Sequence, residues 1–273
     1  MLGLGTALSK EVKAGGAFTP MSISNILVWL KYNTGINSTM ATDGSSKTEV
    51  TTDAGTMVDD DMIDQWNDAS GNGRHAQGPR TSGSGASDGS DDPRWTDSDN
   101  SLDFASQSKW MDLVQVDSAN IVIPAETDYS VVMHVNFTNV SSRGLFGFNA
   151  NNQLTIKNSK RFLIKIGDST ALNLEEASDT IATGTWYTLI LVRSNGSTGD
   201  IDLYVNGGGY SDKNWDAAQN GTDTGQATIS NIGAHADNSN MMNGFYKSFI
   251  VYQTALSADD RANIYSYYSD NLS

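Results

Sequence analysis

The sequence contains no cysteine among its 273 residues. Disulfide bonds and thiolate metal sites are therefore excluded, and the fold must rely on packing and hydrogen bonds alone. Apolar runs are also short, well below the roughly 20 residues that a membrane-spanning helix needs. The opening MLGLGTALSKEVKAGG lacks the basic region of a secretory signal. We therefore expect assembly in the cytoplasm and no membrane insertion.

Basic residues are scarce as well, with 17 Lys and Arg against 32 Asp and Glu, for a formal net charge of −15. Binding to nucleic acid needs a basic stripe that neutralises phosphates, and the sequence has none, so nucleic acid is excluded as a partner. The three histidines, His75, His134 and His235, lie far apart and flank no G-x-S-x-G motif. A Ser-His-Asp triad and a zinc site therefore have no starting point.

The 26 glycines and many short apolar runs indicate a β protein rich in turns. The clearest signal is a β-hairpin between Trp186 and Gly207. Residues 187–193 form an apolar run, residues 200–205 alternate with period two, and Asn195-Gly196 tolerates the positive φ of a chain reversal. Further strands are expected at residues 26–30, 102–104, 121–123, 129–137, 145–148, 153–156, 161–166, 227–232 and 245–252.

Several side chains receive structural interpretations from these patterns. In the strand at 129–137, His134 lies on the face opposite the apolar one, where we interpret it as a hydrogen-bonded polar residue rather than a ligand. We expect Trp29, Trp66 and Trp186 in the core. Ser257 and Asp260 form an S-x-x-D capping box, and this pattern predicts a terminal helix that docks through Ile264, Tyr267 and Tyr268.

Together these elements predict an all-β fold, an antiparallel jelly-roll sandwich over residues 21–273 with a short C-terminal helix. Residues 1–20 differ from the rest, because glycines punctuate a mildly apolar segment. We interpret this segment as an N-terminal arm that docks on another subunit, and a frayed terminus is the alternative. Its docking residues would be Leu2, Leu4, Leu8 and Phe18.

Four segments, in order, carry a resemblance to the concanavalin A-like jelly-roll family, which includes laminin-G-like and pentraxin-like domains. They are residues 26–36, the W-x-D-x-SGNG-x-HA segment at 66–76, the hairpin at 186–208 and the closing segment at 244–268. The match spans about residues 22–268. Relatives often carry an acidic residue after the glycine of the closing strand, where this chain has Phe245-Tyr246-Lys247.

The MLGLG opening followed directly by a jelly roll is also similar to virion structural proteins of tailed bacteriophages. That resemblance implies a capsid decoration protein or a tail-fibre accessory on the virion exterior, assembled in the host cytoplasm. The chain would be a homo-oligomer or a repeated subunit, would contact other virion proteins through its arm, and would face host-surface glycans. The alternative is a carbohydrate-binding module of a bacterial surface or secreted protein.

The family resemblance places ligand or calcium contacts on loops at one rim of the sandwich, here residues 209–223 and 235–243. No cofactor is required, but oxygen-rich loops suit calcium. A solvated polar loop, or a Trp215 that plugs the end of the sandwich, is the alternative. The predicted sugar contacts are Tyr210, Asp212, Trp215 and Asp237, and the predicted calcium ligands are Asp216, Asp223, Asp237 and Asn238.

Catalysis is not expected from this sequence. Glycoside hydrolases of the sandwich type use paired carboxylates in an E-x-D-x-x-E strand, and that spacing is absent. The adjacent pair Glu175-Glu176 would point to opposite faces of a strand and fits a polar loop better. We therefore expect a non-enzymatic protein, and a sandwich-fold glycan hydrolase or lyase is the third hypothesis.

Overall fold

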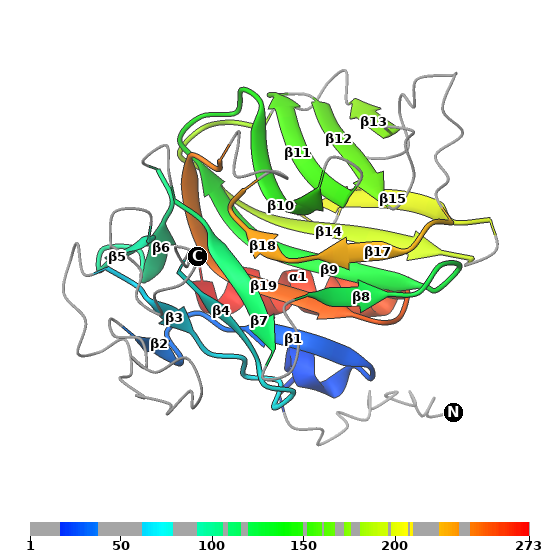
Figure 1. The fold of residues 1–273 in the computed structure, drawn as a ribbon, viewed down its shortest axis with the longest axis horizontal. Helices are drawn as coiled ribbons and strands as arrows, with labels where there is room; N and C mark the ends of the chain where they lie inside the picture. Colours follow the sequence, from blue (N-terminus) through cyan, green and yellow to red (C-terminus); the bar gives the residue numbers. More distant parts are fainter. Residues whose placement is uncertain are drawn as a thin grey trace, which may run out of the picture.

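Two antiparallel sheets packed face to face make up the computed structural model of the protein (Figure 1). The structure describes residues 17–37, 62–78, 92–105, 109–115, 120–149, 152–159, 161–166, 172–175, 181–195, 198–206, 208–209, 224–234 and 241–272. Within these ranges the first sheet runs in the order β16 (Gly208–Gly209), β15 (Asp200–Val205), β14 (Trp186–Ser194), β9 (Tyr129–Phe137), β19 (Gly244–Tyr252), β6 (Ser101–Asp103) and β5 (Arg94–Thr96), with β1 (Ile26–Leu30) also paired to β19.

The second sheet faces the first across the main core. Over the described residues its order is β13 (Leu172–Glu175), β12 (Arg161–Ile166), β11 (Asn152–Asn158), β10 (Arg143–Asn149), β18 (Asn231–Ile232), β7 (Met111–Gln115), β4 (Arg74–Gln77), β3 (Gln65–Trp66) and β2 (Ile36–Asn37), while β17 (Ala227–Ile229) pairs separately with β8 (Ile121–Ile123). The predicted all-β sandwich is therefore confirmed. The predicted hairpin is β14 with β15, and Asn195 and Gly199 adopt positive φ at its turn, 54° and 64°.

Strand β9 lies at the centre of the first sheet between β14 and β19, and all nine of its residues are buried. Val131, Met133 and Val135 face the core between the sheets, as the alternation predicts. Val132 belongs instead to a second apolar cluster on the outer face of the sheet. Because both faces are covered, His134 is a buried residue rather than a solvated one.

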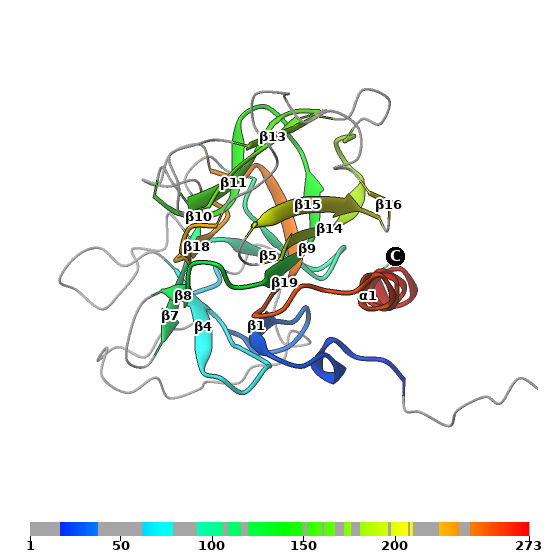
Figure 2. The ribbon, with the colours of Figure 1, turned by 90° about the vertical axis from the view of Figure 1, so that its right-hand side faces the viewer.

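The cover on the outer face is α1 (Ala258–Leu272), which runs along the first sheet on the side away from the second (Figure 2). The predicted capping box is present: the Asp260 amide donates to Ser257 Oγ (3.1 Å), and the Ser257 amide donates to Asp260 Oδ2 (3.1 Å). Ile264 and Tyr268 are buried, and Tyr267 is half-buried, as predicted. No helix in the described part of the chain is long and apolar enough to span a membrane.

The segment at 66–76 serves as a clamp on the free edge of β1. Asp68 Oδ1 accepts hydrogen bonds from the amides of Trp29 (2.9 Å) and Ser70 (2.8 Å), and its Oδ2 accepts one from the Arg74 amide (3.1 Å). Asn72 Nδ2 donates to a β1 carbonyl at 2.8 Å. An exposed strand edge invites pairing with other chains, so this segment protects it.

The chain is already packed on the domain before residue 21. The Phe18 ring meets Tyr267 edge-on with centroids 6.4 Å apart, and Tyr252 Oη donates to the Pro20 carbonyl at 3.1 Å. Pro20 is buried and begins the short 3₁₀ helix η1 (Pro20–Ser22). The other predicted arm residues, Leu2, Leu4 and Leu8, lie outside the described residues.

Candidate functional site

The predicted rim sites lie outside the part of the chain that the structure describes. These are Tyr210, Asp212, Trp215, Asp216, Asp223, Asp237 and Asn238. Their grouping into a sugar or calcium site therefore stays a prediction. Among the described residues, no three His, Cys, Asp or Glu side chains come together to hold a metal ion.

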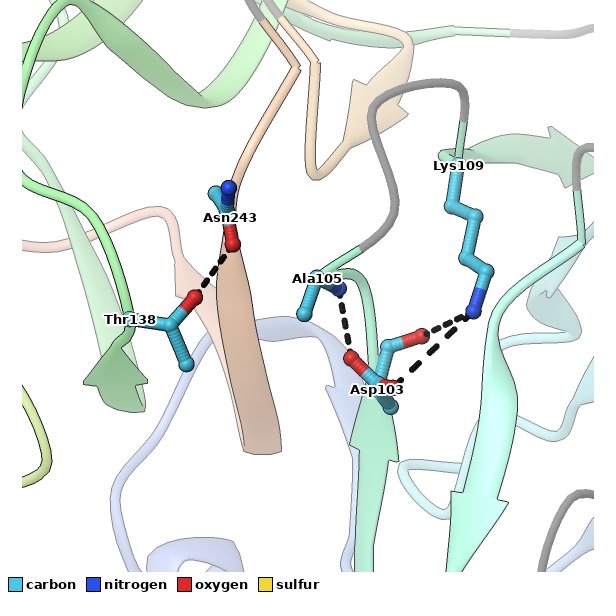
Figure 3. Close-up of polar contacts among 5 residues, drawn as sticks. All are labelled: Asp103, Ala105, Lys109, Thr138 and Asn243. Carbon is cyan, nitrogen blue, oxygen red and sulfur yellow. Dashed lines mark hydrogen bonds and ion pairs between the residues drawn. The ribbon is translucent and has the colours of Figure 1, made fainter.

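One end of the second predicted loop, residues 241–243, is described. Asn243 Oδ1 accepts a hydrogen bond from the Thr138 hydroxyl, and the Asn243 carbonyl accepts one from the Thr138 amide at 2.9 Å. Beside this pair, Asp103 accepts a bond from the Ala105 amide (2.5 Å) and lies 4.0 Å from the buried ammonium of Lys109 (Figure 3). The Thr138–Asn243 pair joins the end of β9 to the residues before β19, and the charge on Asp103 is balanced by Lys109 of its own segment.

A pocket of about 260 Å³ opens on the outer side of the first sheet, next to the C-terminal end of α1. Its described lining residues come from five segments of the chain. It is lined by Tyr32, Ser98, Asp99, Asn100, Trp186, Lys247, Asn271 and Leu272.

Lys247 reaches this pocket because of an irregularity in β19. In the pairing with β9, Tyr246 lies opposite Val135 and Ser248 lies opposite His134, so Lys247 is an extra, bulged residue. Tyr246 points into the core, and the bulge places Lys247 and Ser248 on the outer side. Lys247 Nζ donates to the carbonyl of Leu272 at 3.1 Å, where the negative end of the α1 dipole favours a cation.

Trp186, the first residue of β14, is half-buried and lines the pocket, so the prediction that it belongs to the core was wrong. It lies on the outer face, across from Asn136, where α1 ends and leaves it partly uncovered. Its ring stacks on His134 at 5.2 Å, and His134 stacks on Tyr268 at 5.1 Å, both within 7° of parallel. The Lys247 ammonium lies 4.3 Å from the Trp186 ring centre. The indole is therefore held in one orientation.

Burial governs the protonation of the groups around this stack. Burial, and secondarily the nearby Lys247, lowers the pKa of His134 to about 3, so the ring is neutral near pH 7. Its Nδ1 lies 3.1 Å from Thr188 Oγ1, and its Nε2 is buried without a hydrogen-bond partner in the described structure. Burial also lowers the pKa of Lys247, while Asp99 acts in the opposite direction.

Of the remaining titratable residues that the sequence singled out, His75 has a structural role. His75 Nδ1 accepts a hydrogen bond from the Asp68 amide at 3.1 Å, within the clamp on β1. Glu175 is the last residue of β13, and Glu176 and His235 lie outside the described residues. Trp29 and Trp66 are buried, as predicted.

The sequence patterns did not predict the pocket, because its residues come from the β1–β2 loop, the β5–β6 turn, two different strands and the end of α1. The one local signal was Lys247, which stands near where relatives often have an acidic residue. The face of the sheet on which Lys247 and Ser248 both lie depends on a bulge, and period-two alternation does not predict that bulge.

Comparison with known proteins gives a consistent fold. A family model described as the concanavalin A-like lectin/glucanases superfamily matches residues 111–260. None of the curated protein sequences matches significantly. A point mutant of HCR/D has a TM-score of 0.53 at 13% identity, with 89% of this chain and 51% of that chain covered.

Two further solved structures extend the comparison. The sialidase of Trypanosoma rangeli has a TM-score of 0.50 at 11% identity, and the match covers 92% of this chain and 34% of that chain. Domain 4 of AbnA, an extracellular arabinanase from Geobacillus stearothermophilus solved in complex with arabinotriose, has a TM-score of 0.49 at 16% identity, with 72% and 91% covered. This chain thus spans only part of the sialidase and of HCR/D, and at these identities the likeness shows the fold alone. Since the family model covers more than half of its residues, the chain belongs to the concanavalin A-like lectin/glucanases superfamily.

Proposed function

We propose that the chain is a non-catalytic carbohydrate-binding domain and that the pocket beside the end of α1 receives the sugar. The observation that carries this proposal is the lining of the pocket. Two aromatic side chains, Trp186 and Tyr32, stand next to the short polar side chains of residues 98–100. The Tyr32 ring offers apolar area to the C–H groups of a sugar, Trp186 forms a fixed side of the pocket, and carboxylate, amide and hydroxyl groups pair with the sugar hydroxyls.

The site is preorganised, which favours binding of a small polar ligand. The Trp186 ring is fixed by its stack on His134 and by Lys247, so little side-chain entropy is lost on binding. The Trp186 side of the pocket therefore does not need to change conformation when a ligand binds. The superfamily is described by its lectins and glucanases, both of which engage carbohydrate, and this supports the same ligand class.

Binding rather than hydrolysis is proposed because of the acidic residues in the pocket. Among the lining residues that the structure describes, Asp99 is the one carboxylate. Hydrolysis of a glycosidic bond by the usual mechanisms requires a pair of carboxyl groups roughly 5 to 10 Å apart. A single carboxylate supports hydrogen bonding to sugar hydroxyls.

The test is a titration followed by 1H–15N NMR, which detects weak binding. Simple methyl glycosides should shift the amide signals of residues 98–100 and of Asn271. Tyr32→Ala should weaken the affinity at least about fivefold through the loss of aromatic contact. The matched control is Tyr265→Ala, since Tyr265 does not line the pocket. Unchanged spectra with every glycoside, or equal loss in both variants, would contradict the proposal.

The setting that we propose is the exterior of a bacteriophage particle, as a capsid decoration protein or fibre accessory. This part is supported by the sequence resemblance and by the acidic, cysteine-free composition. The structure sharpens its test, because Phe18 and Pro20 contact the domain itself. Deletion of residues 1–16 should therefore remove the docking segment without disturbing the sandwich, and should abolish incorporation into particles. Normal incorporation would refute the docking role and favour a free carbohydrate-binding module.

A further inference from the structure

From the size and charges of the pocket we infer that it takes a single, uncharged sugar unit and discriminates against sugars that carry a carboxylate. This inference rests on the proposed function, because it names the class of sugar that the same site would hold. It concerns the pocket lined by Asp99, Trp186 and Lys247.

The volume limits the ligand to one ring. At about 260 Å³ the pocket lies just below the roughly 300 to 1,000 Å³ of sites that hold drug-sized ligands. Its lining comes from the sheet floor at Trp186 and Lys247, the end of α1, and the loops that carry Tyr32 and residues 98–100. A second or third sugar unit would therefore extend beyond the pocket and gain few contacts.

Among the described lining residues Lys247 is the one basic residue, and its ammonium already has partners. Its ammonium donates to the Leu272 carbonyl at 3.1 Å and lies 4.3 Å from the centre of the Trp186 ring. Asp99 interacts with it electrostatically and counteracts the effect of burial on its pKa. A ligand carboxylate that sought this ammonium would compete with three existing partners.

The remaining charges of the pocket repel an anion. Asp99 contributes a carboxylate to the described lining, and the last carbonyls of α1 present the negative end of a helix dipole. The formal charge of −15 on the chain adds a long-range field of the same sign. A neutral sugar avoids this cost, and its hydroxyls can donate to Asp99 and accept from the amides of Asn100 and Asn271.

The experiment uses the full chain and two matched sets of probes in the NMR titration. The neutral set is methyl glucoside, galactoside, mannoside, xyloside and arabinoside. The charged set is methyl glucuronide and galacturonide, which differ from the first two by a C6 carboxylate. We expect a dissociation constant on the order of 1 mM for the best neutral glycoside. The matched uronide should bind at least about tenfold more weakly, and the trisaccharide of the best neutral sugar should stay within about threefold of the monosaccharide.

Asp99→Asn provides the matched variant, because it removes the charge and keeps the size of the side chain. The ratio of the dissociation constant of the uronide to that of its neutral match should fall from about tenfold to below about threefold in this variant. The control is Asp259→Asn, because Asp259 is an exposed aspartate in the first turn of α1. This variant should leave the ratio of the two dissociation constants unchanged.

The outcomes separate this inference from the proposed function. A uronide that binds as tightly as its neutral match, or a trisaccharide that binds more than about tenfold tighter than one unit, overturns the inference while sugar binding itself stands. If no neutral or charged glycoside shifts the signals of the pocket, the proposed function fails and the inference fails with it.

Discussion

His134 shows how far burial can change the role of one side chain. It is 6% exposed, it is stacked between the rings of Trp186 and Tyr268, and one ring nitrogen has a partner in Thr188. Burial of an imidazole disfavours its charged form, so the folded protein holds it neutral. The residue therefore links the stability of the helix layer to pH.

The first prediction concerns this linkage. The pKa of His134 is about 3 in the folded protein against about 6.5 in an unfolded chain, so between these values only the unfolded state binds the proton. Stability should be fully present above about pH 6.5 and should fall as pH decreases, by up to about 1.4 kcal/mol per pH unit from this group. Denaturant unfolding at pH 5 and pH 7 measures the slope.

His134→Phe keeps a flat ring in the stack and removes the titration. Its loss of stability between pH 7 and pH 5 should be smaller than that of the unmodified protein, since acidic groups elsewhere contribute equally to both. If stability changes equally with pH in the two proteins, His134 binds its proton as readily in the folded state as in the unfolded state, and the prediction is wrong.

Arg193 has a different role, because it is a fully buried cation held by backbone carbonyls. Nε donates to the Thr127 carbonyl (2.9 Å), Nη1 to that of Gly225 (2.5 Å) and Nη2 to that of Pro124 (3.1 Å). Its guanidinium also lies 4.7 Å from the Tyr129 ring centre. One side chain thus ties β14 to two connecting segments.

The second prediction is that Arg193→Lys destabilises the protein by about 3 kcal/mol, because a single ammonium cannot satisfy carbonyls in three directions. Urea unfolding at pH 7 provides the measurement. Arg261→Lys, at a partly exposed arginine that donates to the Leu256 carbonyl, should cost under about 1 kcal/mol. Similar costs for the two variants would contradict the role of Arg193.

At the scale of elements, the segment at 66–76 is best understood as part of the scaffold. It was one of the four segments that carried the family resemblance, and its Asp68 and Asn72 side chains form hydrogen bonds with the edge of β1. Gly71 (φ 84°) and Gly73 (φ 68°) let the chain turn back so that Asp68 can accept three amide hydrogen bonds. The same segment joins β1 of the first sheet to β3 and β4 of the second.

The third prediction is that Asp68→Ala destabilises the fold by about 2 to 3 kcal/mol, because buried and half-buried amides lose their acceptor. It should also increase self-association, since the β1 edge is uncovered. Urea unfolding and analytical ultracentrifugation measure the two effects. Asp200→Ala, at an aspartate that accepts from Asn195 in an exposed turn, is the control and should cost under about 1 kcal/mol. A variant with unchanged stability and unchanged self-association would exclude the clamp.

At the scale of the whole molecule, the protein has three layers: the second sheet, the first sheet and α1 (Figure 2). The first sheet is shared, because one of its faces packs on the main core and the other packs on the helix. Tyr268 illustrates the connection, since its hydroxyl donates to Ser248 Oγ at 2.7 Å and that hydroxyl donates to the Leu30 carbonyl at 3.0 Å. We therefore expect the layers to unfold together.

The fourth prediction tests this coupling with Ile264→Ala, which truncates a fully buried side chain on the face of α1 that packs on the first sheet. The free energy of unfolding should fall by about 3 kcal/mol. Far-UV circular dichroism and tryptophan fluorescence should still report one coincident transition, shifted to lower denaturant. An early, separate loss of helical signal would show that α1 is an independent unit.

Much of the fold was predictable because it depends on short-range patterns. Period-two alternation located β9 and the β14–β15 hairpin, and a serine and an aspartate three residues apart located the start of α1. The composition also excluded disulfides outright. Function was less accessible, because the predicted rim residues, Asp212 and Trp215 among them, lie outside the described residues, and no local pattern indicates that the separate segments of the pocket come together.

The sequence by itself therefore determined the sandwich, its hairpin and its capped helix, because alternation, turn residues and caps act over a few neighbouring positions. Only the tertiary structure decided that α1 covers the outer face of the first sheet. That packing buries His134, leaves Trp186 partly open and brings Leu272 to the bulged Lys247. These contacts include residues that are more than a hundred positions apart, such as His134 and Tyr268, and their geometry follows from how the layers pack rather than from the order of residues along the chain.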